Sequence, residues 1–372
     1  MSVNNVKWVR LGDYIEPCDE RNSDGLYNLD DVRGISIMKK LISTKADMKD
    51  VILTPYKLLK PSEFSYVTVT SRNGGKISLA LNDTENTFIV SSSYINFRPK
   101  NNSELLSEYL YLLLSREEFD RYSRFNSWGS ARETFDWEEL CRVIIPLPEP
   151  KVQQELVDTY NGLKSIAEQN EALIEPLSKA CEAFIVDCNK KYTEVKLGDY
   201  IEESIERNIN NEITLTQGVD VNMQFIPAKR EAFDKENTKI VRTGQFAFNK
   251  VVKAGGTKLP IALRKGKDCI ISSSYCVFQI LKPHYLISEF LFIWMSRKEF
   301  HRYCGFVSKG TTRDVFDYED LCSLKIPLPP PEVQQSIVNV YNCLEEAKKI
   351  AREAREKLKT LCPALVQRAA NS

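Results

Sequence analysis

The sequence predicts an α+β fold made of a tandem repeat, in which each globular unit is followed by a long helix. The segment Val-Arg-Leu-Gly-Asp-Tyr-Ile-Glu at 9–16 returns as Val-Lys-Leu-Gly-Asp-Tyr-Ile-Glu at 195–202, and the proline-rich segment 145–160 returns at 326–341. Each proline-rich segment then leads into a run with helical periodicity. Because proline cannot continue a strand ladder but is tolerated in the first turn of a helix, each segment predicts where a globular unit ends and a helix begins.

The repeat predicts four consecutive parts of the chain. They are a first globular unit at 1–147, a first long helix at 148–190, a second globular unit at 191–328 and a second long helix at 329–372. Matching residues lie 186 positions apart at the start of the units, but 181 positions apart from Ser91 and Ser272 onward. The second unit has therefore lost a net five residues in its middle. We expect a pseudo-two-fold axis to relate the halves.

Each globular unit combines predicted strands with predicted helices. The strand segments are rich in β-branched and aromatic residues and are bounded by Gly, Asn, Asp and Lys, whereas the helix segments carry an apolar stripe. The strand segments include 64–70, 87–90, 244–249 and 269–271, and the helix segments are 104–119 and 286–300.

Both long helices carry apolar residues at alternating steps of four and three, the heptad spacing of helices that pack as a coiled coil. The predicted seam of the first helix is Val152, Leu156, Thr159, Leu163, Ile166, Asn170, Leu173, Leu177, Ala180 and Phe184. That of the second is Val333, Ile337, Val340, Leu344, Ala347, Ala351, Ala354, Leu358, Leu361 and Leu365. One such stripe is equally typical of an amphipathic helix buried in a globular domain. Two at matching places favour an intramolecular antiparallel coiled coil.

Three residues of these helices have consequences of their own. Asn170 either fixes the register of the pair or occupies a partly exposed seam position. Pro176 and Pro363 each remove a helix hydrogen bond, so we expect a kink or an early end at each.

Charge and cysteine usage narrow the class of protein. The chain has 51 basic and 51 acidic residues, so no overall field recruits nucleic acid or membrane, although a neutral protein can still carry a basic face. Ten cysteines without a C-x-x-C pair, accompanied by only two histidines, favour reduced and buried thiols over a zinc site. With no signal peptide and no apolar run of spanning length, we expect a cytoplasmic protein without a membrane partner.

The Leu-Gly-Asp-Tyr opening, the Pro-Leu-Pro-x-Pro-x-Val-Gln-Gln element and their tandem repetition resemble the specificity subunit of type I restriction-modification systems, nearly end to end. The resemblance implies two target recognition domains, each reading one half of a split double-stranded DNA site, with the helices as a ruler. It implies a non-catalytic subunit that joins two adenine-N6 methyltransferase subunits, with or without two motor-nuclease subunits. S-adenosylmethionine would then be bound by the methyltransferase partner, and this chain would hold no cofactor.

The motifs of the relevant enzymes are missing from the sequence, which supports a subunit without chemistry of its own. There is no Asn/Asp-Pro-Pro-aromatic element of an amino-methyltransferase, and the Gly-Lys pairs at 75–76 and 266–267 lack the preceding glycine of a nucleotide-binding loop. Glu194-Val-Lys196 has the carboxylate and lysine of a nuclease motif, but it fits the solvated start of a strand better. We predict no catalytic or metal-ligating residue.

The first pair of candidate DNA-binding loops lies at 71–76 and 252–257, aligned at a spacing of 181. Both are basic and contain glycines, which allow a close approach to phosphates. Arg72 has the donors to pair with guanine, and Asn73 can pair with adenine. A hairpin turn with a solvated charge explains the same residues equally well. The basic candidates that complete this pair are Lys76, Lys253 and Lys258.

The second pair of candidate loops follows the predicted helices. Arg132 and Arg313 recur in both units, so they are expected to hold phosphate rather than to distinguish bases. An ion pair inside the unit, with Glu133 or Asp136 as the partner of the first arginine, is the alternative. The other candidates are Arg124, Asn126, Ser127 and Ser130 in the first unit, and Ser308, Lys309, Thr311 and Thr312 in the second.

Together these expectations describe a geometric mechanism. The loops enter the major groove, where all four base pairs are distinguishable, and the helix pair sets an unread spacer between two different half-sites. Two alternatives stay open: a coiled-coil scaffold or adaptor without sequence-specific DNA binding, and the recognition half of a fused restriction-modification enzyme. Methyl transfer by the purified chain alone would indicate the fused enzyme, and unchanged DNA mobility of the assembled complex would indicate the scaffold.

Overall fold

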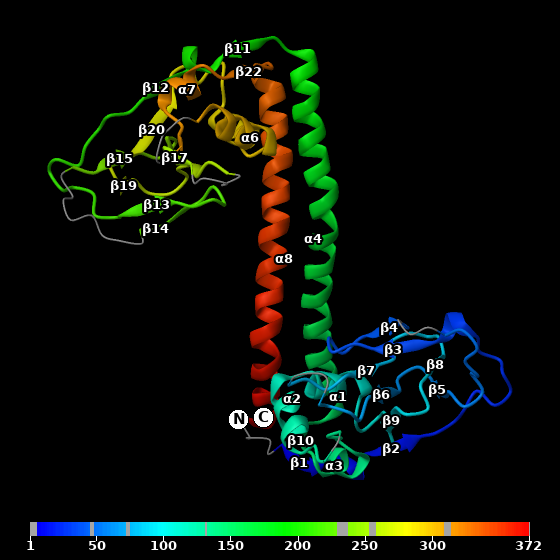
Figure 1. Cartoon of the computed structure of the whole chain (residues 1–372). Coiled ribbons are helices and arrows are strands. Elements are labelled where there is room, and N and C mark those ends of the chain that lie inside the picture. The colour runs from blue at the N-terminus through cyan, green and yellow to red at the C-terminus, as the bar shows by residue number, and fades with distance from the viewer. Residues whose placement is uncertain are drawn as a thin grey trace. The chain divides into compact units, whose positions relative to one another are not determined.

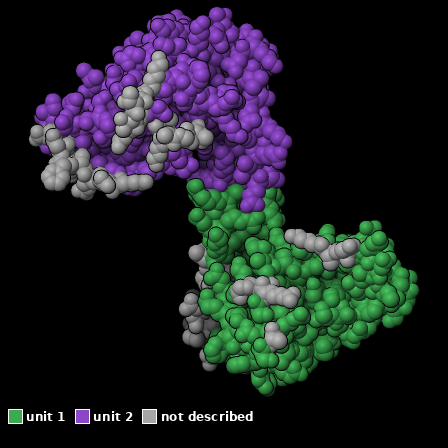
Figure 2. Space-filling view, in the orientation of Figure 1, with its two compact units in different colours: residues 1–169, 350–372 green, residues 170–349 purple. Residues whose placement is uncertain are grey.

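The computed structural model describes residues 6–44, 48–71, 75–130, 132–228, 237–252, 258–308 and 314–371. The chain divides into two compact units, which Figure 2 shows in different colours: unit 1 comprises 1–169 and 350–372, and unit 2 comprises 170–349. Each unit therefore contains one globular part together with a portion of both long helices.

The globular part of unit 1 has a four-stranded antiparallel sheet at its centre, in the order β2-β9-β6-β7, with the strand pairs β1-β10, β3-β4 and β5-β8 around it (Figure 1). The strands are β1 Lys7–Arg10, β2 Ile15–Cys18, β3 Arg33–Ile35, β4 Leu41–Ser43, β5 Lys57–Leu59, β6 Phe64–Tyr66, β7 Leu79–Leu81, β8 Phe88–Val90, β9 Ile95–Pro99 and β10 Ile144–Leu147. The helices are α1 Ser107–Leu114, α2 Glu117–Phe125 and α3 Trp137–Arg142, with 3-10 turns η1 Leu11–Asp13 and η2 Leu29–Asp31.

Unit 2 repeats this plan, with a four-stranded sheet in the order β12-β20-β16-β18 and the pairs β11-β22, β13-β14, β15-β19 and β17-β21. Its strands are β11 Glu194–Lys196, β12 Ile201–Glu203, β13 Gln217–Val219, β14 Phe225–Pro227, β15 Lys239–Val241, β16 Phe246–Asn249, β17 Val251–Val252, β18 Ile261–Leu263, β19 Cys269–Ile271, β20 Tyr275–Ile280, β21 Asp314–Val315 and β22 Lys325–Pro327. The helices are α5 Ser288–Met295, α6 Lys298–Val307 and α7 Tyr318–Cys322, with the 3-10 turn η3 Leu197–Asp199. The predicted tandem α+β fold is confirmed.

One prediction about these units is wrong in both copies. The segments 104–119 and 286–300 are not single helices, because α1 and α5 end before a Ser-Arg pair and α2 and α6 begin after it. In unit 2 the Ser296 hydroxyl donates to the Ile293 carbonyl, and the Arg297 backbone is extended. A serine that bonds the preceding turn competes with helix continuation.

The cores of the two units are built on the same aromatic stack. Phe64 and Phe97 stack with centroids 4.8 Å apart, and Phe246 and Phe278 do so at 4.7 Å. All four rings are fully buried between the central sheet and the short helices. The packed sheet provides a rigid base for the connections at its edges.

The repeated Val-Gln-Gln element fastens each long helix to its globular part. The buried Gln153 side chain accepts from the Leu106 amide at 2.9 Å and donates to the carbonyls of Glu104 and Pro148 at 2.8 and 2.9 Å. Gln334 does the same with Ile287, Tyr285 and Pro329 at 2.7–2.8 Å. One side chain thus satisfies three backbone groups that would otherwise be buried without a partner.

The repeated Leu-Gly-Asp element requires its glycine. A Cβ on Gly12 would lie 2.7 Å from the Cβ of Cys141, and one on Gly198 would lie 2.8 Å from that of Cys322. The preceding leucine amides donate to Val143 and Leu324, each at 2.8 Å. This contact closes the start of each globular part against its end.

The long helices are α4, Pro150–Lys191, and α8, Pro331–Asn371. In unit 2 they pack antiparallel, since Ile185 and Cys188 near the end of α4 share one core with Ile337 and Val338 near the start of α8. The early end expected at Pro176 or Pro363 does not occur, because each helix continues past its proline.

The seam of α8 is as predicted, and that of α4 is not. Ile337, Leu344, Ala347, Ala351 and Ala354 are buried, and Val333, Val340 and Leu358 are half-buried, whereas Leu361 and Leu365 lie outside the side chains that the structure describes. On α4 the predicted seam residues Thr159, Ile166, Leu173 and Phe184 are exposed, and Val152, Leu163, Asn170, Leu177 and Ala180 are half-buried. Of the predicted seam of α4 only Leu156 is buried, and the other buried residues of this helix are Gln153, Val157, Ala167, Cys181, Ile185 and Cys188. The buried face of α4 therefore lies about one residue from the predicted face, and it includes the small side chains of Ala167 and Cys181.

Candidate nucleic-acid interface

In unit 2 the two candidate loops leave the fold from one short ribbon. β17 pairs with β21, with Val251 opposite Val315 and Val252 opposite Asp314. The Phe316 amide donates to the Lys250 carbonyl at 2.9 Å and extends the pairing. Residues 253–257 follow β17 and 309–313 precede β21, so both loops start at the same end of this ribbon. The loops themselves lie outside the described residues.

Unit 1 forms the same ribbon with looser pairing. Val69 bridges to Thr134, the Thr70 amide donates to the Glu133 carbonyl at 3.0 Å, and the Phe135 amide donates to Thr68 at 2.9 Å. The structure therefore brings together two segments that the sequence separates, the turn after β6 and the loop after α2.

Strand register corrects the predicted alignment of the first pair of loops. Phe64 pairs with Leu81 and Phe246 pairs with Leu263, so both strands that flank the loop are displaced by 182 residues. The predicted displacement of 181 is wrong here and applies only from β8 and β19 onward. Lys76 therefore corresponds to Lys258, and both side chains are exposed at the end of the loop.

The predicted residues of unit 1 occupy different environments. Lys76, Ser130 and Arg132 are exposed near the ribbon, while Arg72 and Asn73 lie outside the described residues. Gly129, with φ of 141°, lies directly before Ser130, and a Cβ there would meet the Arg132 carbonyl oxygen at 2.2 Å.

The residues at the end of α2 are engaged within the fold. The Asn126 side chain donates to the Tyr122 carbonyl at 2.9 Å, and the buried Ser127 hydroxyl donates to Ser123 at 2.6 Å. Arg124 forms an ion pair with Glu133 at 2.5 Å, with both side chains partly exposed. Of these three, only Arg124 presents charge at the surface.

The ion-pair alternative proposed for Arg132 does not occur among the residues that the structure describes. Glu133 is paired with Arg124, and the Asp136 carboxylate accepts from the Glu139 amide at 3.0 Å as the cap of α3. The exposed Arg132 therefore remains available to a partner.

In unit 2 the described candidates are Lys258 and Ser308. The Ser308 hydroxyl donates to the Cys304 carbonyl and closes the end of α6, as Ser127 closes α2. Lys253, Lys309, Thr311, Thr312 and Arg313 lie outside the described residues.

Sequence reasoning missed a buried ion pair beneath the loops of unit 1. Lys39, in the β3–β4 turn, lies 2.6 Å from the Asp120 carboxylate, and both side chains are more than nine-tenths buried. The same oxygen accepts from the Ile77 amide at 3.2 Å, directly after Lys76. Burial lowers the pKa of Lys39, although the bond to Asp120 opposes this shift. The pair joins a hairpin, a helix and the loop.

Unit 2 makes this joint without an ion pair. His301 stands in the place of Asp120, and its Nδ1 accepts from the Leu259 amide at 3.2 Å, directly after Lys258. Met223, in the β13–β14 turn and with a positive φ like that of Lys39, packs on the core. Burial, and then the charge of Lys258, lower the pKa of His301 to about 4, so the ring is neutral at pH 7.

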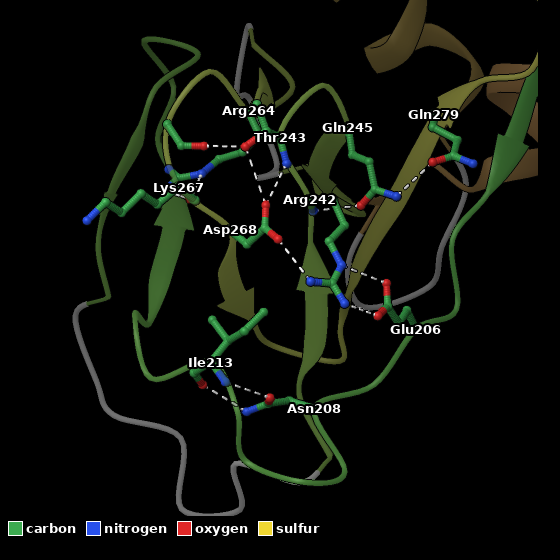
Figure 3. A network of polar contacts seen from close by, with 11 residues as sticks. Glu206, Asn208, Ile213, Arg242, Thr243, Gln245, Arg264, Lys267, Asp268 and Gln279 are labelled. Atoms are coloured by element: carbon green, nitrogen blue, oxygen red, sulfur yellow. Dashed lines mark hydrogen bonds and ion pairs between the residues drawn. The ribbon is translucent and has the colours of Figure 1, made fainter.

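Sequence reasoning also missed a polar network around the turn that follows β15 in unit 2 (Figure 3). The Arg242 guanidinium donates to Glu206 at 3.1 Å and to Asp268 at 2.9 Å, and the Thr243 amide donates to Asp268 at 2.9 Å. Hydrogen bonds to the two carboxylates raise the pKa of Arg242. In unit 1 the same turn is held by Lys60 and Glu20 at 2.6 Å. Because these cations are neutralised locally, we assign them a structural role.

No group of His, Cys, Asp and Glu among the described residues has the geometry to hold a metal ion. Of the helices that the structure describes, none is long and apolar enough to cross a membrane.

Comparison with known proteins identifies the family. The model of the type I restriction modification DNA specificity domain matches twice, at 35–176 and 186–360. The chain therefore belongs to the family of type I restriction-modification DNA specificity subunits, with two specificity domains in tandem. No curated protein matches the chain.

The solved structure of one S subunit agrees with this assignment at the level of fold. The S subunit of a type I restriction-modification system from M. genitalium has 12% sequence identity and a TM-score of 0.60, with 99% of both chains covered. The HsdS subunit from Thermoanaerobacter tengcongensis has 15% identity and a TM-score of 0.42, covering 99% of this chain and 97% of its own.

Proposed function

We propose that this chain reads a bipartite, asymmetric double-stranded DNA site, with one half-site for each globular part. The observation that carries the proposal is the ribbon in each unit, because it presents two loops at matching places on two cores. The loops are anchored alike yet differ in sequence, as expected when one scaffold reads two different sequences. In the major groove such loops distinguish all four base pairs.

Within each half-site we assign different roles to the candidate residues. Arg132 and Arg313 occur in both units and would hold phosphates, which fixes the register without reading sequence. Lys76 and Lys258, now placed at equivalent positions, would do the same. Base discrimination then falls to residues that differ between the units, with Arg72 and Asn73 as the candidates of unit 1.

The long helices would set the spacer and dock two adenine-N6 methyltransferase subunits, with or without two motor-nuclease subunits. Methyl transfer, and the S-adenosylmethionine that it consumes, would belong to the methyltransferase. The chain itself would supply binding and assembly in the cytoplasm. The target adenine of each half would leave the duplex for the pocket of a methyltransferase subunit.

Binding selection from random duplexes, with the chain co-purified with its methyltransferase subunit, tests the reading of DNA. We expect two unlike half-sequences at a constant separation. A palindromic site would contradict the assignment of one different half to each globular part, and no enrichment at all would favour the scaffold alternative.

The spacer assignment has its own test. A seven-residue insertion at matching points of both α4 and α8 preserves the heptad face and lengthens the pair by about 10 Å, roughly three base pairs. We expect the same half-sites with a longer spacer. An insertion in α4 alone is the control, because it misaligns the seams. Changed half-sites with an unchanged spacer would refute the ruler.

A further inference from the structure

Two phenylalanines at matching positions are exposed to solvent beside the loops. Phe125 is the last residue of α2 and is 78% exposed, and Phe306, near the end of α6, is 88% exposed. They are 181 residues apart, the displacement that relates α2 to α6. Exposing a large ring is unfavourable in water, and here it is repeated at the same place in two cores whose surfaces otherwise differ.

Each of these rings lies beside an exposed cation on its own helix. Arg121 and Arg302 precede the two phenylalanines by four residues, which places them on the same helix face. Arg121 is paired with Glu117 and Glu118 at 3.9 and 3.4 Å, but its side chain is 67% exposed. An exposed pair of this kind is worth at most about 1 kcal/mol, so a phosphate can replace its carboxylates.

A second cation approaches the same stretch of helix from the sheet. The residues that follow Lys76 and Lys258 donate their amides to Asp120 and His301, each directly before the helix arginine. Each unit therefore carries the same set in the same places: a lysine, an arginine and an exposed phenyl ring. Cations that flank an exposed aromatic ring are typical of surfaces that hold phosphates while the ring contacts bases.

We infer that Phe125 and Phe306 are equivalent base-contacting residues, one for each half-site, whose rings stack on or between bases while the neighbouring cations hold the phosphates. The inference rests on the proposed function and adds a contact that both half-sites share. Because the ring stacks without reading hydrogen bonds, it contributes affinity to both halves, and the differing loops supply sequence. A phenyl ring inserted at a base step also unstacks it locally.

The test uses the complex of the full chain with its methyltransferase subunit and duplexes carrying the selected site. F125A and F306A are each expected to weaken binding about tenfold, as for the loss of one aromatic–base contact. Scrambling the first half-site should abolish the effect of F125A but not that of F306A, and scrambling the second should do the reverse. With 2-aminopurine placed at successive positions of the duplex, binding of the wild-type complex should raise the fluorescence at one base step in each half-site. F125A should remove this increase in the first half-site only, and F306A should remove it in the second half-site only.

Two controls make the outcome decisive. Tyr285→Ala removes a ring that is 61% exposed elsewhere on unit 2 and should leave affinity unchanged, while Phe125→Tyr should retain most of the binding. Wild-type affinity of both alanine variants for a site that the complex demonstrably selects would overturn the inference and leave the proposed function standing. Loss of the methyltransferase subunit from the variants, with DNA affinity per complex unchanged, would assign the rings to a protein contact and also overturn it. If the wild-type complex selects no bipartite site, the proposed function fails and the inference falls with it.

Discussion

Unit 1 joins its β3–β4 hairpin to α2 through the buried Lys39–Asp120 pair, whereas the matching positions of unit 2 hold Met223, which packs on the core, and a neutral His301. In both units the helix residue, Asp120 on α2 or His301 on α6, also accepts a hydrogen bond from a backbone amide at the end of the first candidate loop. This amide belongs to the residue directly after Lys76 or Lys258. The joint is thus conserved as geometry but not as chemistry. By contrast, the glutamine that fastens each long helix keeps its identity and all three of its bonds.

This difference shows which parts of the repeat are free to diverge. Gln153 and Gln334 serve helices that both copies need in the same place, so any change leaves buried backbone groups unsatisfied. At the base of the candidate loops, by contrast, the two units use different residues: the Lys39–Asp120 ion pair in unit 1 and the neutral His301 in unit 2. This is tolerated because a buried ion pair is seldom more stable than well-packed neutral groups.

The largest effect is expected from breaking the joint of unit 1. Asp120→Ala leaves Lys39 buried without a counter-charge and should destabilise unit 1 by about 3–5 kcal/mol. Amide hydrogen exchange of α2 and β7 measures the loss. The double variant K39M/D120H transplants the solution of unit 2 and should recover most of the protection. If it is as unstable as the single variant, the two joints are not equivalent.

A smaller and equal effect is expected from the shared glutamines. Gln153→Leu and Gln334→Leu each remove one acceptor and two donor contacts from buried backbone groups, for about 3 kcal/mol apiece in urea unfolding. The neighbouring Gln154 and Gln335 are exposed and bond only within the helix, so the same substitution there is the control. A large change in one unit and none in the other would contradict a common fastening.

The smallest effect is a pH dependence confined to the joint of unit 2. The folded-state pKa of His301, about 4, lies below its unfolded value of 6.5, so its contribution is complete above pH 6.5 and is lost as pH falls toward 4. From pH 7 to pH 5 the loss should be about 2 kcal/mol. His301→Asn keeps an acceptor near Nδ1 and should flatten this slope in the exchange of α6. An unchanged slope would show that other groups cause it.

Sequence predicted the repeat, the α+β units and the seam of α8, because periodic burial and duplicated motifs are local signals. The seam of α4 was misplaced because two adjacent faces carry apolar residues. The larger Ile166 and Leu173 suggested one face, whereas the structure buries the other, which carries Ala167 and Cys181. Which face wins depends on the partner helix, not on the helix alone.

Only those parts of the candidate site whose residues are close together in the sequence could be predicted from it. The basic loops were recognised from composition, but the ribbon that joins them pairs residues more than 60 positions apart, and Lys39 meets Asp120 across 81 residues. Phe125 and Phe306 gave no signal either, since an apolar residue at the end of a helix ordinarily predicts core. Only the structure shows that these two rings face solvent.

Co-expression of the chain with its methyltransferase subunit, followed by a genome-wide map of N6-methyladenine, tests the central claim most directly. The account predicts one split motif with two unlike halves, a constant unread spacer and one modified adenine in each half, absent when either protein is omitted. A palindromic motif, or no new methylation despite a stable complex, would contradict it.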